Sequence, residues 1–240
     1  MEFTKNDLLK KEIASKKSLQ IKLLGDSITH GVGGSGYSPT DEHIVGEFKR
    51  NNSGYCWANK FKEYIKENFA STVINNGCSG TTIEFIIKYF NELVDESDDF
   101  IICTIGTNNR HQYFCDGSKL SREEMCDKFY SNIIKLHSMI KALNKPVIFM
   151  ANIPASKENE QDGESYWRIL HMDDINNIYK KASAECDFPL ISLYDLFSDY
   201  CVANEKTLDE FLLDGLHPND KGYDVMFNLI INALELNRVL

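Results

Sequence analysis

The sequence lacks long apolar runs. Its N-terminal segment, Met1 to Gln20, carries too many charged residues for the hydrophobic region of a signal peptide, and no later run approaches membrane-spanning length. We therefore expect a cytoplasmic protein. Positive charge is also scarce, because 26 Lys and Arg residues stand against 36 Asp and Glu residues, for a net charge of −10. That balance argues against nucleic acid or an anionic membrane as the main partner.

Recognisable cysteine motifs are lacking as well. The sequence contains no Cys-x-x-Cys pair and no Cys/His spacing typical of zinc ligands. An odd number of scattered thiols favours reduced cysteines over a disulfide framework or a metal site. The seven cysteines are Cys56, Cys78, Cys103, Cys115, Cys126, Cys186 and Cys201.

What the chain does contain is a regular alternation of short apolar runs and longer amphipathic segments. Runs typical of strands lie at 19–24, 72–75, 100–105, 146–150 and 188–193, and helical spacing of apolar residues lies at 55–69, 82–94, 121–143, 167–185 and 220–236. This alternation is typical of a parallel sheet covered on both faces. We predict a three-layer α/β/α fold, a flavodoxin-like doubly wound sheet of five parallel strands in the order 2-1-3-4-5.

The domain organisation follows from the same pattern. No internal repeat or low-complexity linker interrupts the alternation, so we expect one domain over residues 19–240, after an N-terminal arm or short helix over 1–18. Residues 31–54 are rich in Gly, Ser, Asn and charge, and we expect a long irregular loop there, of the kind that usually serves function. Ser121 and Glu124 have the spacing of a capping box.

The stretch Gly25-Asp26-Ser27-Ile28-Thr29-His30-Gly31 follows the first predicted strand. Glycines around a small hydroxyl residue at a strand end let the serine Oγ stand clear of its backbone. The same residue types are common in ordinary turns and helix N-caps. Ser27 is therefore a candidate nucleophile whose assignment depends on partners elsewhere in the chain.

A serine hydroxyl becomes a strong nucleophile when a base takes its proton and an acid orients that base. Asp214 and His217, three residues apart before the last predicted helix, have the types and the spacing for these two roles. His30 lies nearer to Ser27 along the chain, but no acid stands at a suitable spacing from it. Taken alone, Asp214 could equally be an ordinary turn residue.

Donors for a developing oxyanion should lie at the same edge of the sheet. In an open parallel sheet the segments after the strands meet outside their carboxyl ends, so Ser27 would face the turn 77–80 and Asn108. The N–H groups of Ser27 and Gly80 and the side-chain amide of Asn108 could then bind the oxyanion. Gly77 competes with Gly80, because both stand in the same turn.

Four blocks in this order resemble the SGNH hydrolase superfamily, also called GDSL esterases or lipases. The resemblance covers about residues 19–236 and implies that Ser27 is the nucleophile, Asp214 the acid and His217 the base. It also implies that Ser27, Gly80 and Asn108 form the oxyanion hole. The blocks are Gly25-Asp26-Ser27, Gly77-Cys78-Ser79-Gly80, Gly106-Thr107-Asn108 and Asp214-Gly215-Leu216-His217-Pro218.

One position departs from the family pattern. The family often has Asp after the Asn of the third block, whereas this sequence has Asn109. We expect this departure to alter hydrogen bonding in the loop rather than to remove the side-chain donor of Asn108.

The resemblance implies a serine esterase that forms an acyl-enzyme on Ser27 and needs no metal or organic cofactor. The loops expected around the pocket are polar and carry a few aromatic rings, which suits a sugar ester better than a long acyl chain. We therefore expect a short-chain ester, such as an acetyl ester, on a carbohydrate or another polar small molecule. The residues expected to contact this substrate are Asp26, Tyr37, Arg110, His111 and Trp167.

Two other functions fit the same residues. An O-acyltransferase would use the same triad but pass the acyl group to a sugar hydroxyl instead of water. A non-catalytic carbohydrate-binding domain could keep the fold without turnover, although four intact blocks argue against it.

Overall fold

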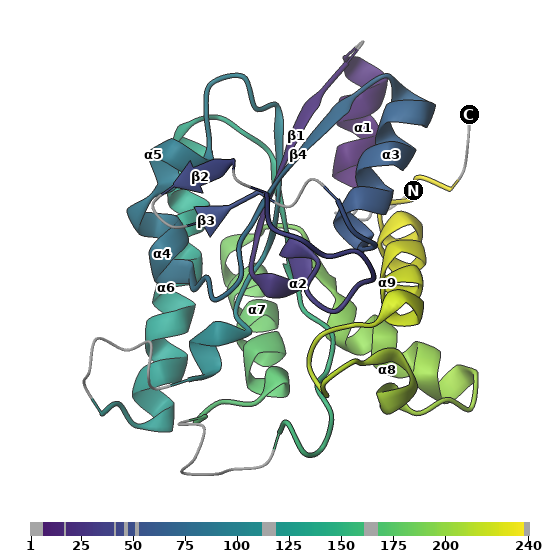
Figure 1. The fold of residues 1–240 in the computed structure, drawn as a ribbon. Helices are drawn as coiled ribbons and strands as arrows, with labels where there is room; N and C mark the ends of the chain where they lie inside the picture. The colour runs from purple at the N-terminus through teal and green to yellow at the C-terminus, as the bar shows by residue number, and fades with distance from the viewer. Residues whose placement is uncertain are drawn as a thin grey trace.

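The structure is a computed structural model that describes residues 7–16, 18–40, 42–45, 48–50, 53–111, 119–160 and 168–237. Its central sheet is parallel and has the strand order β4-β1-β5-β6-β7, which confirms the predicted order 2-1-3-4-5 (Figure 1). A separate antiparallel pair is formed by β2 (His43–Val45) and β3 (Phe48–Lys49). The five strands are β1 (Gln20–Gly25), β4 (Thr72–Gly77), β5 (Phe100–Thr104), β6 (Val147–Ala151) and β7 (Leu190–Ser192).

Helices cover both faces of the sheet and complete three layers (Figure 1). Side chains of β5 divide between the two faces, because alternate residues of a strand point to opposite sides. One face packs against α1 (Leu8–Ser15), α3 (Trp57–Phe69), α8 (Leu193–Ala203) and α9 (Asp220–Ala233). The other packs against α4 (Ile83–Lys88), α5 (Phe90–Leu93), α6 (Arg122–Ala142) and α7 (Met172–Cys186).

Several elements differ from the sequence prediction. The loop expected at 31–54 contains β2 and β3, and the helix expected at 82–94 is divided into α4 and α5 at Tyr89. Helix α8 was not predicted. It follows β7 directly because the Ser192 hydroxyl caps it, accepting from the Asp195 N–H at 3.0 Å. The capping box of Ser121 and Glu124 at the start of α6 is confirmed.

The described cysteines, which are all but Cys115, are free thiols. No helix in the part of the chain that the structure describes is long and apolar enough to cross a membrane.

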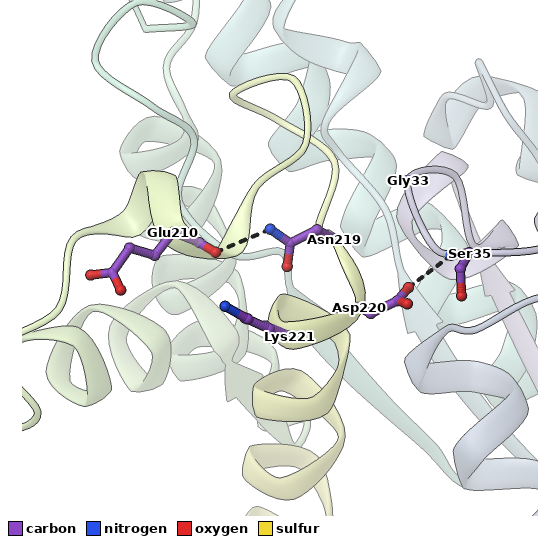
Figure 2. A pocket seen from close by; sticks show the side chains of 6 residues that line it. All are labelled: Gly33, Ser35, Glu210, Asn219, Asp220 and Lys221. Atoms are coloured by element: carbon purple, nitrogen blue, oxygen red, sulfur yellow. Dashed lines mark hydrogen bonds between the residues drawn. The ribbon is translucent and has the colours of Figure 1, made fainter.

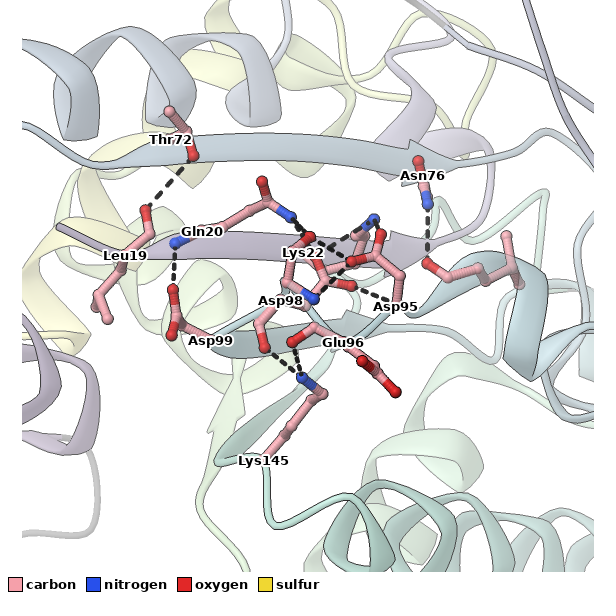
Figure 3. A network of polar contacts seen from close by, with 12 residues as sticks. Leu19, Gln20, Lys22, Thr72, Asn76, Asp95, Glu96, Asp98, Asp99 and Lys145 are labelled. Atoms are coloured by element: carbon pink, nitrogen blue, oxygen red, sulfur yellow. Dashed lines mark hydrogen bonds and ion pairs between the residues drawn. The ribbon is translucent and has the colours of Figure 1, made fainter.

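A buried ion pair lies near the start of β1. The side chains of Lys22 and Asp98 are 5% and 0% exposed, and Lys22 Nζ lies 3.4 Å from Asp98 Oδ1. Asp98 also accepts hydrogen bonds from Gln20 Nε2 at 3.0 Å and from the Asp95 backbone N–H at 2.9 Å (Figure 3). The pair thus joins β1 to the turn that leads into β5.

Replacing Lys22 by Met removes the cation but leaves the Asp98 carboxylate buried. We expect the free energy of unfolding to fall by about 3 to 5 kcal/mol, measured by urea denaturation. The matched control is Lys16→Met, because Lys16 pairs with Asp99 at 3.1 Å but its side chain is 42% exposed. That control should lose less than about 1 kcal/mol. Equal losses in the two variants would contradict this account of the Lys22 pair.

Candidate active site

Ser27 occupies the first position of α2 (Ser27–His30), directly after β1. The Asp26 side chain caps this short helix by accepting from the Ile28 N–H at 3.1 Å, and Gly31, at φ 103°, ends it. The chain therefore turns sharply where the strand ends. The turn brings Ser27 to the carboxyl edge of the sheet, where its Oγ contacts His217.

Asp214 and His217 complete a chain of hydrogen bonds with Ser27. His217 Nε2 lies 2.9 Å from Ser27 Oγ, and His217 Nδ1 lies 2.7 Å from Asp214 Oδ2. Asp214 Oδ1 accepts from the His217 backbone N–H at 2.8 Å, so both carboxylate oxygens hold the same histidine. In this arrangement an imidazole protonated at Nδ1 can accept the serine proton at Nε2.

The charge of Asp214 is stabilised by its neighbour. Burial alone would raise the pKa of the Asp214 carboxyl, but hydrogen bonds from the backbone and ring of His217 lower that pKa below its ordinary value. Asp214 is therefore ionised at neutral pH. An ionised acid is what a developing imidazolium requires.

The loop that carries Asp214 and His217 is held by backbone hydrogen bonds. The Leu213 N–H donates to the His217 carbonyl at 2.8 Å, so the loop closes on itself. The Ser156 N–H donates to the Gly215 carbonyl at 2.8 Å and joins the loop to the segment after β6. The side chains of Asp214 and His217 are thus held in place by the protein itself.

Gly80 and Gly77 differ in whether their N–H groups are engaged. The Gly77 N–H donates to Asn75 Oδ1 at 2.9 Å at the end of β4. Gly80 is exposed, at φ 77°, and no acceptor for its N–H is found among the residues that the structure describes. The geometry therefore favours Gly80 over Gly77 as an oxyanion donor.

Asn108 begins the short helix η2 (Asn108–Arg110), after β5. Its Nδ2 donates to the Thr81 carbonyl at 2.9 Å. Because an amide nitrogen carries two N–H groups, this bond orients the amide and leaves one N–H for a ligand. Thr81 follows Gly80 directly, so this bond places the Asn108 amide beside the turn that carries Gly80.

Asn109 shows what the departure from the family pattern does. Its Oδ1 accepts from the Ile83 N–H at 3.1 Å, and its Nδ2 donates to Glu84 Oε2 at 2.7 Å. A carboxylate at this position could accept the first bond but could not donate the second. Asn109 thus binds the start of α4, while the side chain of Asn108 remains at the site.

Asp26 is fully buried, and its predicted contact with substrate is wrong. Its Oδ2 accepts from Asn152 Nδ2 at 3.0 Å, and the same nitrogen donates to Thr107 Oγ1 at 2.8 Å. Burial raises the pKa of Asp26, and hydrogen bonds with Thr107 and Ile28 oppose this shift. Asp26 therefore connects the start of α2, which carries Ser27, to the segment after β6. The sequence prediction missed Asn152, although it too is a polar residue directly after a strand.

Arg110 is fully buried as well, which contradicts its predicted contact with substrate. Its Nε donates to the Thr107 carbonyl at 3.0 Å, and its terminal nitrogens reach Glu160 Oε1 at 2.9 Å and Asn159 Oδ1 at 3.3 Å. Burial lowers the pKa of Arg110 to about 10, and Glu160 opposes the shift, so the guanidinium stays charged at neutral pH. Arg110 joins the segment that carries Asn108 to the loop after β6.

Of the other three residues predicted to contact substrate, Tyr37 lies beside the turn that carries Gly80. The Tyr37 hydroxyl lies 3.4 Å from Ser79 Oγ, beside Gly80, so Tyr37 remains a candidate for contacting substrate. His111 forms an isolated antiparallel bridge with Arg168 at the end of η2. Trp167 lies outside the described residues.

A pocket of about 350 Å³ adjoins the loop that carries His217 (Figure 2). Two hydrogen bonds join its lining residues, since the Ser35 N–H donates to Asp220 Oδ1 at 2.7 Å and Asn219 Nδ2 to the Glu210 carbonyl at 3.0 Å. The pocket is lined by Gly33, Ser35, Glu210, Asn219, Asp220 and Lys221.

One group of possible metal ligands, His171, Asp173 and Asp174, lies at the start of α7. Arg122 Nη2 lies 2.7 and 2.6 Å from the two carboxylate oxygens of Asp174, and the His171 N–H donates to Asp174 Oδ2 at 2.7 Å. Helix capping and an ion pair therefore account for Asp174 without a metal.

The fold and the site define a class of protein. A doubly wound parallel sheet carries a Ser-His-Asp chain at its carboxyl edge, with hydrogen-bond donors beside the serine, as in serine hydrolases. Residues 23–225 match the model of the GDSL-like lipase/acylhydrolase family. The chain belongs to this family and is a carboxylic ester hydrolase.

Several proteins are similar to this chain at low sequence identity. The isoamyl acetate-hydrolyzing esterase of Schizosaccharomyces pombe is 24% identical over 222 residues, which cover 90% of this chain and 74% of that protein. A variant of an acetyl-xylooligosaccharide esterase from Geobacillus stearothermophilus has 18% identity and a TM-score of 0.68, with 92% and 96% of the two chains covered. An α/β hydrolase from the metagenome of Lake Arreo has 19% identity and a TM-score of 0.66, with 90% and 95% covered. The likeness to these two structures shows the fold.

Substitution by Ala should separate the two glycines. At Gly77 a Cβ atom would lie 2.8 Å from the His30 backbone nitrogen, so Gly77→Ala should cost about 1 to 3 kcal/mol of stability. At Gly80 a Cβ atom has space, but φ 77° disfavours it, so the turn should move and kcat should fall roughly 10-fold or more. Steady-state kinetics and melting temperatures measure both effects. Unchanged kcat in Gly80→Ala would contradict the role of Gly80.

Proposed function

We propose that this enzyme hydrolyses short-chain esters, acetyl esters above all, of a carbohydrate or another polar small molecule through an acyl-enzyme on Ser27. The observation that carries the proposal is the chain from Asp214 through His217 to Ser27 Oγ, with contacts of 2.7 and 2.9 Å. A serine in this setting is activated for attack on an ester carbonyl.

In the proposed first step, His217 Nε2 takes the Ser27 proton while Oγ attacks the ester carbonyl carbon. The negative charge that develops on the carbonyl oxygen would be received by the N–H groups of Ser27 and Gly80 and by the Asn108 amide. The imidazolium then gives its proton to the leaving alcohol, and the acyl group stays on Ser27. Water attacks the acyl-enzyme next, with His217 again as the base, and releases the carboxylic acid.

The names of two similar proteins support an acetyl group. The esterases from Schizosaccharomyces pombe and Geobacillus stearothermophilus both carry an acetyl ester in the names of their substrates. The xylo-oligosaccharide named for the Geobacillus esterase is a hydroxylated leaving group, whereas the isoamyl alcohol named for the Schizosaccharomyces esterase is an alkyl one, so the polar alcohol rests on the first of these names.

A panel of esters tests the proposal. We expect kcat/KM to fall from p-nitrophenyl acetate through butyrate to octanoate, and acetylated xylo-oligosaccharides to release acetate. Ser27→Ala and His217→Ala should each lower kcat by about a thousandfold or more while the fold, followed by circular dichroism, is kept. Rates that rise with chain length would contradict the acetyl preference, and turnover retained in both variants would contradict the triad.

Adding an acceptor alcohol to the same assay distinguishes hydrolysis from acyl transfer. With p-nitrophenyl acetate as donor and xylobiose as added acceptor, we expect acetate as the product, with acetyl-xylobiose at most a minor one. Acetyl-xylobiose as the main product would replace hydrolysis by transfer without changing the role of Ser27.

A further inference from the structure

The tip of the turn that carries Gly80 is open to solvent, although Cys78 and Thr81 on either side of it are buried. Ser79 and Gly80 are exposed, and a Cβ atom on Gly80 would meet no heavy atom within 4 Å. An oxyanion donor acts through a fixed direction, since a preorganised N–H group costs no rearrangement during the reaction. The Thr81 N–H donates to the Cys78 carbonyl at 3.2 Å, and Asn108 Nδ2 binds the Thr81 carbonyl. Neither bond involves an atom of Ser79 or Gly80, so this exposed tip still needs a hydrogen bond to a rigid neighbour.

His30 makes that hydrogen bond. Its side chain is 4% exposed, and the Ser79 backbone N–H donates to His30 Nδ1 at 3.3 Å. The Ser79 hydroxyl also lies 3.3 Å from Nδ1, and the Tyr37 hydroxyl lies 3.2 Å from it. The Tyr37 ring stands edge-on to the imidazole, with centroids 5.3 Å apart. His30 thus contacts the residue next to Gly80 and is enclosed by Tyr37.

The helix that carries His30 also carries Ser27, and the protein fixes it. Asn75 Nδ2 donates to the Thr29 carbonyl at 2.9 Å, and the Tyr223 hydroxyl donates to the carbonyl of the residue after Ser27 at 3.2 Å. The bond from His30 therefore places the turn relative to the same short helix that places the nucleophile.

We propose that His30 is a positioning residue for ester hydrolysis, which accepts the Ser79 N–H and thereby holds the Gly80 N–H toward the oxyanion. The inference rests on the proposed function, because it assumes that Gly80 binds the oxyanion. The acceptor role requires an unprotonated Nδ1. Burial lowers the pKa of His30, which favours the neutral imidazole that an acceptor nitrogen requires, although a hydrogen bond with the Lys49 backbone opposes the shift.

Three substitutions at His30 test the role. In His30→Asn, the side-chain Oδ1 occupies the position of Nδ1 and can accept the Ser79 N–H. His30→Gln places its oxygen nearer the position of Nε2, and His30→Leu removes the acceptor. His137→Leu is the matched control, because His137 is half-buried on α6 and packs against Phe188, with ring centroids 5.1 Å apart. The measurements are kcat, KM and melting temperature with p-nitrophenyl acetate.

We expect kcat to fall roughly 10- to 100-fold in His30→Leu and His30→Gln with KM within about twofold, because one oxyanion donor is misdirected. His30→Asn should keep kcat within about threefold of the wild type, and His137→Leu should keep kcat whatever its melting temperature. If His30→Leu does not fold, the ratio of kcat between His30→Asn and His30→Gln tests the acceptor role of His30.

Full kcat in the Leu and Gln variants, or equal losses in Asn and Gln, would overturn the role of His30. A raised KM with unchanged kcat would make His30 a substrate contact instead. Wild-type protein without any ester turnover would overturn the proposed function itself, which keeps the two failures distinct.

Discussion

The hydrogen bond between Ser27 Oγ and His217 Nε2 is the contact on which the site depends. Its partners are 190 residues apart in the sequence, so the contact exists only in the folded sheet. β1 makes this possible because it pairs with β4 on one side and β5 on the other. The segments after these three strands therefore place Ser27, Gly80 and Asn108 at one edge, and the loop before α9 places His217 beside Ser27.

Buried polar side chains connect the segments that carry Ser27 and Asn108 to the rest of the fold. Asp26 is bound by Asn152 from the end of β6, and Arg110 connects the segment after β5 to Glu160. Asn109 binds the start of α4. The side chains of Asp26, Arg110 and Asn109 have their partners within the protein, which is the condition under which a buried polar group stabilises rather than destabilises a fold. A rigid support of this kind suits a reaction that needs fixed hydrogen-bond donors.

Local pattern was enough to predict the strands, because an apolar run or helical spacing is a property of a short segment. The order of the strands followed from the right-handed crossovers of a doubly wound parallel sheet. The placing of Ser27, Asp214 and His217 on one edge followed from that order and from the four family blocks. Arg110 was misread as a substrate contact because its burial depends on Glu160, which is 50 residues away. Helix α8 was missed, since it begins without a connecting loop, and the break at Tyr89 has no proline or glycine to mark it.

The central claim is that the fold activates Ser27 as the nucleophile. Intact-mass and peptide mass spectrometry after treatment with a fluorophosphonate measure this directly, because the reagent adds covalently to an activated serine. The account predicts one adduct per chain, located on Ser27, that forms much more slowly in His217→Ala. Labelling at another residue, or labelling of Ser27 at an equal rate without His217, would contradict it.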